Sequence, residues 1–107
     1  MSGTELEFLV PAAFEWDENK SKANLSKHGY AFDDASQVLY RPVMLYRSDR
    51  KNEERWVAIG HLEERTIAVI FARREEVIRI ISARRARKNE ERAYRNAKVG
   101  RSPEGQD

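Results

Sequence analysis

The sequence predicts an α+β domain that combines two N-terminal helices, a four-stranded antiparallel sheet and a basic C-terminal helix. Two observations lead to this fold class. The hydrophobic period changes from helical to alternating after Pro42, and it becomes helical again near Arg84. Helices that flank an unbroken run of strands are typical of α+β proteins. A chain of 107 residues is long enough for one domain with one modest core.

The predicted domain lies between two less ordered ends. Residues 1–13 lack periodicity and are expected to form a loose segment, whereas the alternation of residues 14–16 is compatible with a short leading strand. We therefore expect a single domain over residues 14–97 and a flexible tail over residues 98–107.

Two helices are predicted at the start of this domain. Asp17 is a favourable N-cap for a helix over residues 18–28, and Gly29 can end that helix in the left-handed conformation. Asp33 is the predicted cap of a shorter second helix, which Pro42 stops.

The next four elements are predicted to be strands over residues 43–47, 55–61, 66–72 and 76–83. Because the connections between them are short, neighbouring strands are expected to pair antiparallel as a meander. The third strand is almost wholly apolar, so we expect it at the centre of the sheet with both faces covered. The basic helix is expected over residues 84–97, with a thin apolar stripe that docks on the sheet.

The expected register of these strands brings arginines onto one face of the sheet. Two-residue turns at residues 63–64 and 74–75 would place Arg79 across from Ile70, on the same face as Arg55. A slip of one residue would move these side chains to the other face, because side chains alternate along a strand.

Composition excludes several classes of site. The chain has no cysteine, which excludes disulfides and thiolate metal sites. It has no apolar run long enough to span a bilayer, so we expect a cytoplasmic protein without membrane contact. Net charge is only +2, but residues 1–36 carry three Lys/Arg and seven Asp/Glu, whereas residues 73–101 carry eleven and four. The basic C-terminal third favours a surface that binds phosphate or an acidic partner.

No pattern in the sequence indicates a metal site, a cofactor, a glycine-rich phosphate loop or a Ser-His-Asp arrangement. The remaining chemistry that the residues suit is metal-free cleavage of RNA, in which the substrate's own 2′-hydroxyl attacks the neighbouring phosphorus. Arginines would neutralise the charge of the transition state, and His, Glu, Lys or Tyr would move the protons.

Each candidate for this chemistry also has a structural interpretation. His28 can complement the dipole at the end of its helix, and His61 can be a plain surface residue. Glu91 can pair with an arginine one turn away, and Tyr94 can dock its helix on the sheet. Arg79 is the hardest to explain structurally, because an arginine in the middle of an apolar strand needs a partner or a purpose.

Three ordered groups of residues resemble the BrnT-type toxins, and together they extend over about residues 14–95. They are Phe14-Glu15-Trp16-Asp17 with Lys20, Asn24, Lys27-His28-Gly29, Phe32 and Ala35, then Glu54-Arg55 with Ile59-Gly60, and finally Arg79-Ile80-Ile81-Ser82-Ala83-Arg84 with Glu91 and Tyr94.

The resemblance implies a RelE-like fold and a ribonuclease toxin of a type II toxin–antitoxin pair, which inhibits translation by cutting RNA. It also implies a BrnA-type antitoxin with a ribbon-helix-helix domain, through which the complex would reach operator DNA and repress its own operon. The family often has glycine where this chain has Glu53, and a non-glycine there is expected to alter the hairpin and shift Arg55.

On this resemblance the candidate catalytic residues are Arg79, Arg84, Arg55, Glu91, Tyr94 and His61. The candidate RNA-binding residues are Lys27, His28, Arg73, Arg85, Arg87 and Lys88. Arg79 and Arg84 would hold the scissile phosphate with help from Arg55, whereas Tyr94, Glu91 or a histidine would transfer protons. The alternative is a non-catalytic basic module that binds nucleic acid or an acidic protein.

Overall fold

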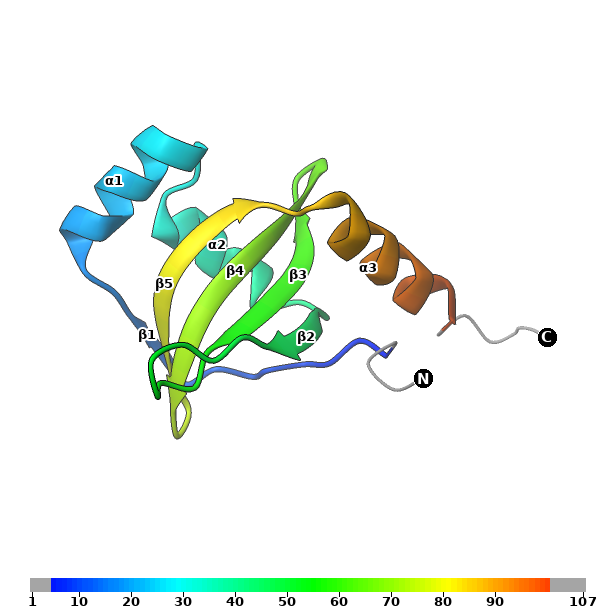
Figure 1. The fold of residues 1–107 in the computed structure, drawn as a ribbon, viewed down its shortest axis with the longest axis horizontal. Helices are drawn as coiled ribbons and strands as arrows, with labels where there is room; N and C mark the ends of the chain where they lie inside the picture. The colour runs from blue at the N-terminus through cyan, green and yellow to red at the C-terminus, as the bar shows by residue number, and fades with distance from the viewer. Residues whose placement is uncertain (1–4, 101–107) are drawn as a thin grey trace.

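The computed structural model describes residues 5–100 of the chain. Its elements are, in order, β1 (Ala13–Glu15), α1 (Glu18–His28), α2 (Phe32–Val38), β2 (Met44–Arg47), β3 (Trp56–Leu62), β4 (Arg65–Arg74), β5 (Val77–Arg85) and α3 (Lys88–Gly100). The strands form one sheet in the order β1-β5-β4-β3-β2 (Figure 1). Within the described residues, none of the helices has the length and apolar character needed to span a lipid bilayer.

The predicted α+β fold is confirmed, including the antiparallel meander of β2 to β5. The leading strand is also present, and it makes the sheet mixed because β1 pairs parallel with β5. The strand predicted to be central is β4, which has two neighbours and an almost continuous buried stretch over residues 66–69. Ahead of β1, Glu7 pairs with Val43 and Leu9 is buried. The domain limits stay a prediction, and residues 101–107 of the predicted tail lie outside the described residues.

The sheet separates two apolar clusters. On one face α1 and α2 pack against β5 and β3, around buried residues such as Phe32, Phe71 and Ile80. On the other face α3 packs against β3 and β2, around Ile59 and Tyr94. Figure 1 shows α3, in orange, on the side of the molecule away from α1.

Contact between α2 and β3 is unusually close at Gly60. A Cβ atom at this position would lie 2.7 Å from Cγ1 of Val38 and 3.1 Å from Cγ1 of Val43. Any larger residue would therefore push α2 away from the sheet.

The ends of α1 agree with the predicted signals. The Asp17 carboxylate accepts hydrogen bonds from the backbone amides of Asn19 and Lys20, and Gly29 ends the helix with φ of 87°. The predicted cap of α2 is wrong, because the helix begins at Phe32, one residue before Asp33. The Phe32 amide instead donates to the buried Ser21 hydroxyl of α1, at 2.9 Å. A residue from another helix thus satisfies a donor that the local sequence leaves open.

The predicted start of the C-terminal helix is also wrong. Residue 84 was expected to begin it, whereas β5 continues to Arg85 and α3 begins at Lys88. Pairing with β4 explains the difference, because Ala68 lies opposite Arg84 and Ile67 opposite Arg85. Long-range pairing with a central strand outweighs the helical preference of an arginine-rich segment.

The predicted turn at residues 63–64 is confirmed, but the turn at residues 74–75 is displaced by one residue to 75–76. Arg79 therefore lies across from Ala72, not from Ile70. A β-bulge then interrupts the pairing: Phe71 faces Ile80, whereas Ile70 faces Ser82. One residue of β5, Ile81, has no partner of its own on β4.

Candidate active site

The floor of the candidate site is a single row of side chains across four strands. Tyr46 of β2 lies opposite Val57 of β3, Val57 opposite Ile70 of β4, and Ile70 opposite Ser82 of β5. These four residues line a hollow of about 240 Å³ on the α3 face of the sheet. We call it the central hollow.

Arginines surround the central hollow. Arg50 and Arg55 lie between β2 and β3, Arg84 lies near the end of β5, and Arg87 is the residue before α3. The four arginines come from two stretches of chain, residues 50–55 and 84–87, which the fold brings together at one hollow.

The bulge in β5 decides which face carries the arginines. Arg79 and Arg84 are five residues apart, so a regular strand would point them to opposite faces of the sheet. The extra residue Ile81 changes the alternation, which places both arginines on the α3 face. Bulges are frequent beside active sites because they redirect a side chain in this way.

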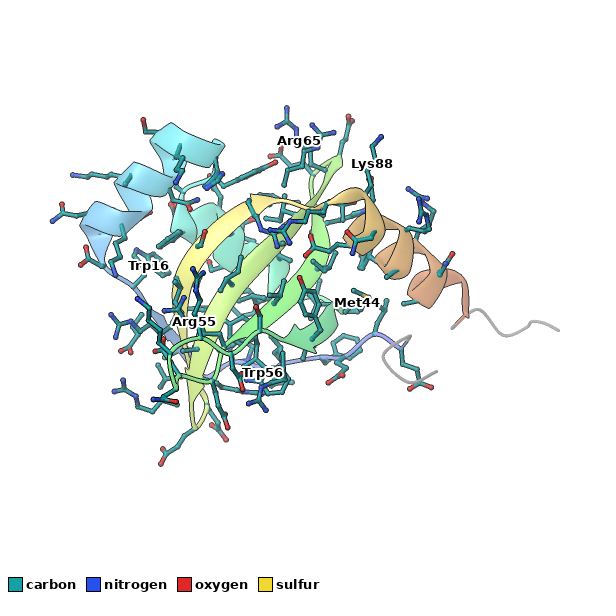
Figure 2. All side chains as sticks on the ribbon, viewed as in Figure 1. Trp16, Met44, Arg55, Trp56, Arg65 and Lys88 are labelled. Carbon is teal, nitrogen blue, oxygen red and sulfur yellow. The ribbon has the colours of Figure 1, made fainter. Side chains whose placement is uncertain are left out.

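Arg79 lines a second hollow of about 150 Å³ that adjoins the first. Arg55 lies two residues before Val57, so it belongs to the cross-strand row of Ala72 and Arg79. Arg55 and Arg79 are thus two strands apart, about 10 Å between backbones. Arg55 lines both hollows and extends over the sheet (Figure 2).

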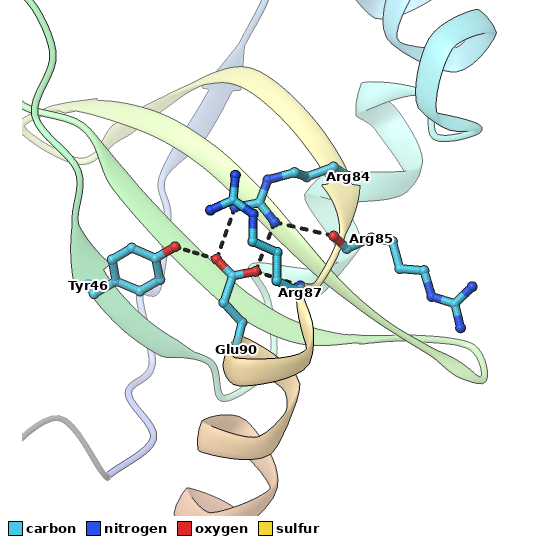
Figure 3. Close-up of polar contacts among 5 residues, drawn as sticks. All are labelled: Tyr46, Arg84, Arg85, Arg87 and Glu90. Carbon is cyan, nitrogen blue, oxygen red and sulfur yellow. Dashed lines mark hydrogen bonds and ion pairs between the residues drawn. The ribbon is translucent and has the colours of Figure 1, made fainter.

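A buried carboxylate fixes one of these arginines. Glu90, in the first turn of α3, has only 4% of its side chain exposed. It accepts two hydrogen bonds from the Arg84 guanidinium at 2.8 and 2.9 Å, one from the Arg87 backbone amide at 2.8 Å, and one from the Tyr46 hydroxyl (Figure 3). Four donors from β2, β5 and α3 therefore converge on one carboxylate.

These contacts set the charge of the groups involved. Burial alone would raise the pKa of Glu90, but the hydrogen bonds from Arg84, Arg87 and Tyr46 outweigh it and lower the pKa to about 2. Burial and the bond to Glu90 raise the pKa of the Tyr46 hydroxyl above its usual value, against a smaller opposite effect of Arg84. At neutral pH the glutamate is therefore ionised and the tyrosine protonated.

The segment of β5 that precedes Arg84 is held by a side chain of α1. The Asn24 amide group donates to the carbonyl oxygens of Tyr30 at 2.7 Å and Ala83 at 2.8 Å. Its oxygen accepts from the Ala83 amide at 3.2 Å and from the Ser82 hydroxyl at 3.3 Å. Asn24 thus occupies the edge of β5 as a neighbouring strand would, beyond the short β1.

Four predicted site residues lie at the two hollows. Arg55, Arg84 and Arg87 line the central hollow, and Arg79 lines the adjoining one. Arg79 is exposed, so the expectation that burial would demand a partner for it does not hold. Arg55 forms an ion pair with Glu53 at 2.8 Å, which shows that the glutamate at this turn reaches the arginine that follows it.

Three predicted proton-transfer residues are not among those that line either hollow. Glu91 is half-exposed on α3 and pairs weakly with Arg95 at 3.9 Å. Tyr94 is buried between α3 and the sheet, where burial raises its pKa. The centroid of its ring lies 5.1 Å from that of the His61 ring. His61 is two cross-strand rows along β3 from Val57, the β3 residue in the floor of the central hollow. These positions match the structural interpretations of Glu91 and Tyr94.

The remaining predicted RNA-binding residues are dispersed. Lys27 and His28 are exposed in the last turn of α1. Arg73 lines a third hollow beside Arg79, near the hairpin between β4 and β5. Arg85 and Lys88 are exposed near the junction of β5 and α3.

Tyr46 and Glu90 were missed by sequence reasoning, although signals for both are present. Alternation in β2 places Tyr46 on the same face as Met44, the α3 face. Glu90 is the third residue of α3, where a glutamate commonly bonds back to the amide that precedes the helix. The sequence prediction started the helix at residue 84, so it did not identify Glu90 as a residue of the first turn.

Comparison with known families identifies the family of the chain. A family model described as ribonuclease toxin, BrnT, of type II toxin-antitoxin system matches residues 16–90. The chain belongs to the BrnT family. A comparison with curated proteins gave no match.

Membership of the BrnT family identifies the chain as a type II ribonuclease toxin, a class whose partner is an antitoxin. The match includes the bulged segment of β5, the arginines of both hollows and Glu90, whereas Glu91 and Tyr94 lie beyond its end. Among the described residues, no three His, Asp or Glu side chains are grouped so that they could hold a metal ion.

Proposed function

We propose that this BrnT-family chain is an endoribonuclease that cleaves RNA at the central hollow without a metal ion. The observation that supports this most is the convergence of Arg55 and Arg84 from β3 and β5 above a floor of uncharged side chains. A phosphate in the hollow would meet arginines from two separate segments, and their positive charge would stabilise a pentacoordinate, doubly charged transition state.

In the proposed reaction the substrate supplies its own nucleophile. The 2′-oxygen attacks the adjacent phosphorus, the bond from phosphorus to the 5′-oxygen breaks, and the products are a 2′,3′-cyclic phosphate and a free 5′-hydroxyl. Arg55 and Arg84 bind the non-bridging oxygens, while Glu90 keeps Arg84 in place. The 2′-proton passes to water at the open hollow.

Tyr46 is the proposed acid for the leaving 5′-oxygen. Tyr46 lines the central hollow, its hydroxyl donates to Glu90, and its raised pKa keeps it protonated at neutral pH. An alkoxide is more basic than a tyrosinate, so the transfer is downhill. Arg84 offsets part of the cost that burial and Glu90 impose on the tyrosinate. The RNA would have to cross the protein along a different path for Glu91, Tyr94 or His61 to act as this acid.

Cleavage by the purified protein tests this proposal directly. A single-stranded RNA is incubated with the protein in excess chelator, beside the same oligonucleotide carrying a deoxyribose at each position. We expect fragments ending in a cyclic phosphate from the RNA alone, because the deoxy strand lacks the nucleophile. RNA that is retarded on a gel but never cut would instead establish the non-catalytic binding module.

Arg55→Ala is the most informative variant in the same assay. Among the described residues, the ion-pair partner of Arg55 is the half-exposed Glu53, so removal of Arg55 leaves no buried charge. We expect kcat/KM to fall about 100-fold or more, the usual cost of one transition-state donor. Arg92→Ala is the matched control, because Arg92 is an exposed arginine of α3 away from the hollows. Equal activity of the two variants would remove Arg55 from the site.

The proposed partner is a BrnA-type antitoxin, through which the complex contacts operator DNA in the cytoplasm. Induced expression of wild-type protein should stop growth and deplete RNA, and the antitoxin should reverse both effects. Arg79→Ala and Arg55→Ala should allow growth while still binding the antitoxin. If both variants still arrest growth, the protein is a toxin but neither arginine is needed for its chemistry.

A further inference from the structure

We infer that the RNA lies on the α3 face of the sheet as an extended single strand, along a track that runs from the start of α3 to the hairpin between β4 and β5. The inference rests on the proposed ribonuclease function and defines its substrate: single-stranded RNA longer than the nucleotides at the scissile bond.

Three hollows that share residues form this track. The central hollow shares Arg55 and Ile81 with the second hollow. The second hollow in turn shares Glu53 and Arg79 with a third, of about 240 Å³, whose lining includes Arg74 near the hairpin. Each shared residue belongs to the walls of two hollows, so the three hollows adjoin one another in series.

Arginines occur along the whole track because of the sheet register. Arg84 and Arg79 lie on the same face of β5, at most about 16 Å apart along the strand. Arg79 lies opposite Ala72 of β4, and Arg74 is two residues beyond Ala72 on the same face. The line of guanidinium groups therefore turns from β5 onto β4 and extends several nucleotide units away from the central hollow.

The outer arginines differ from the inner ones in their partners. Arg84 is paired with Glu90 and Arg55 with Glu53. Arg74 and Arg79 are exposed and make no ion pair with any residue from 5 to 97. Each inner arginine thus has a carboxylate partner, which for Arg84 is buried, whereas the outer pair is available to the phosphates of a flexible chain.

The reaction geometry requires a single strand. Attack by the 2′-oxygen needs it in line with the leaving 5′-oxygen, and the base stacking of an A-form duplex holds these atoms out of line. An extended strand can turn its riboses freely, and its phosphates can follow a bent line of arginines. A duplex would meet the same arginines only along one edge.

The test uses Arg74, which is distant from the scissile position. The ratio of kcat/KM for a long single-stranded RNA to kcat/KM for a dinucleotide is measured for wild type, Arg74→Ala and Arg65→Ala. Arg65 is the matched control, because it is an exposed arginine at the opposite end of the same strand. We expect Arg74→Ala to lower the ratio about tenfold and Arg65→Ala to leave it unchanged.

Binding of the long strand, measured against salt, provides the second readout. Loss of one phosphate contact should reduce the slope of log affinity against log salt by about 0.7 for Arg74→Ala only. A blunt RNA duplex should compete at least about tenfold more weakly than the single strand. If the wild-type enzyme is active and Arg74→Ala leaves the ratio and the slope unchanged, the proposed track is overturned but the ribonuclease proposal is not. Absence of any cleavage by wild type would instead reject the ribonuclease proposal.

Discussion

At the scale of single residues, Glu90 combines deep burial with a strongly lowered pKa. A carboxylate with 4% exposure is costly to ionise unless donors replace the lost water. Glu90 has four such donors, and its position in the first turn of α3 adds the favourable end of the helix dipole. The same contacts that stabilise the fold therefore hold Arg84 at the hollow.

Substitution of Glu90 by glutamine should make the free energy of unfolding less dependent on pH in the acid range. The pKa of Glu90 is lowered from 4.5 to about 2, so its stabilisation is fully present above about pH 5 and is lost as pH falls towards 2. A shift of this size corresponds to about 3 kcal/mol. We expect Glu90→Gln to lower the free energy of unfolding by about that amount at pH 7, and by much less at pH 3, in urea titrations.

Glu91→Gln is the control for this measurement. Glu91 is the neighbouring glutamate, is half-exposed, and makes only a 3.9 Å ion pair with Arg95. Its substitution should change stability by no more than about 0.5 kcal/mol at either pH. If the two variants lost the same stability, the four contacts of Glu90 would have no net effect.

At the scale of secondary structure elements, α1 is unusual because it is attached by polar groups. Its buried residues are Ser21 and Asn24, and its one large apolar residue, Leu25, is half-exposed. Ser21 accepts from the first amide of α2, and Asn24 pairs with the edge of β5. Hydrogen bonds, which depend on direction, therefore fix the position of α1 and of the β5 segment that carries Arg84.

Asn24→Ala should destabilise the protein by about 2–3 kcal/mol, because it leaves buried amide and carbonyl groups of Ala83 without partners. Chemical denaturation measures the loss, and amide exchange at Ala83 should quicken more than elsewhere in β5. Asn19→Ala on the exposed side of the same helix is the control and should change stability by less than about 0.5 kcal/mol. Similar losses at the two positions would mean that α1 is held by other contacts.

At the scale of the whole molecule, the site is a product of how the sheet is assembled. Arg55 and Arg84 are 29 positions apart in the sequence, and the pairing of β3, β4 and β5 brings them to one hollow. The bulge at Ile81 adds Arg79 to the same face. If Arg55 and Arg84 bind the same phosphate, as proposed, the effects of removing them on kcat/KM should not be independent.

A double-mutant cycle of Arg55→Ala and Arg84→Ala should reveal this dependence. Each single variant is expected to lose most of kcat/KM, and the double variant should lose at least tenfold less than the product of the single losses. Pairing Arg55→Ala with Arg92→Ala should give simple multiplication. Strict multiplication in the first cycle would show that the two arginines act at separate places. Thermal melts should show whether the Arg84 variants remain folded, because Arg84→Ala removes two of the four hydrogen bonds to the buried Glu90.

Several features followed from the sequence alone. Asp17 and Gly29 mark the ends of α1, because capping depends on residues adjacent to the helix. The apolar run of β4 indicates a central strand, and the short connections indicate the meander. The resemblance of ordered motifs was enough to indicate the family that the comparison identified. These are local or additive signals, which a single sequence carries without reference to distant contacts.

Only the tertiary structure decided which side chains meet. The start of α3 at Lys88 depends on pairing between β4 and β5, and this start makes Glu90 part of the first turn. The bulge at Ile81 reverses the alternation that the sequence suggests, which puts Arg79 and Arg84 on one face. Register and bulges are set by the fit of distant strands against a shared core. A local sequence pattern therefore does not predict them. That is why the sequence pointed to arginines that line the hollows but not to Glu90 and Tyr46 beside them.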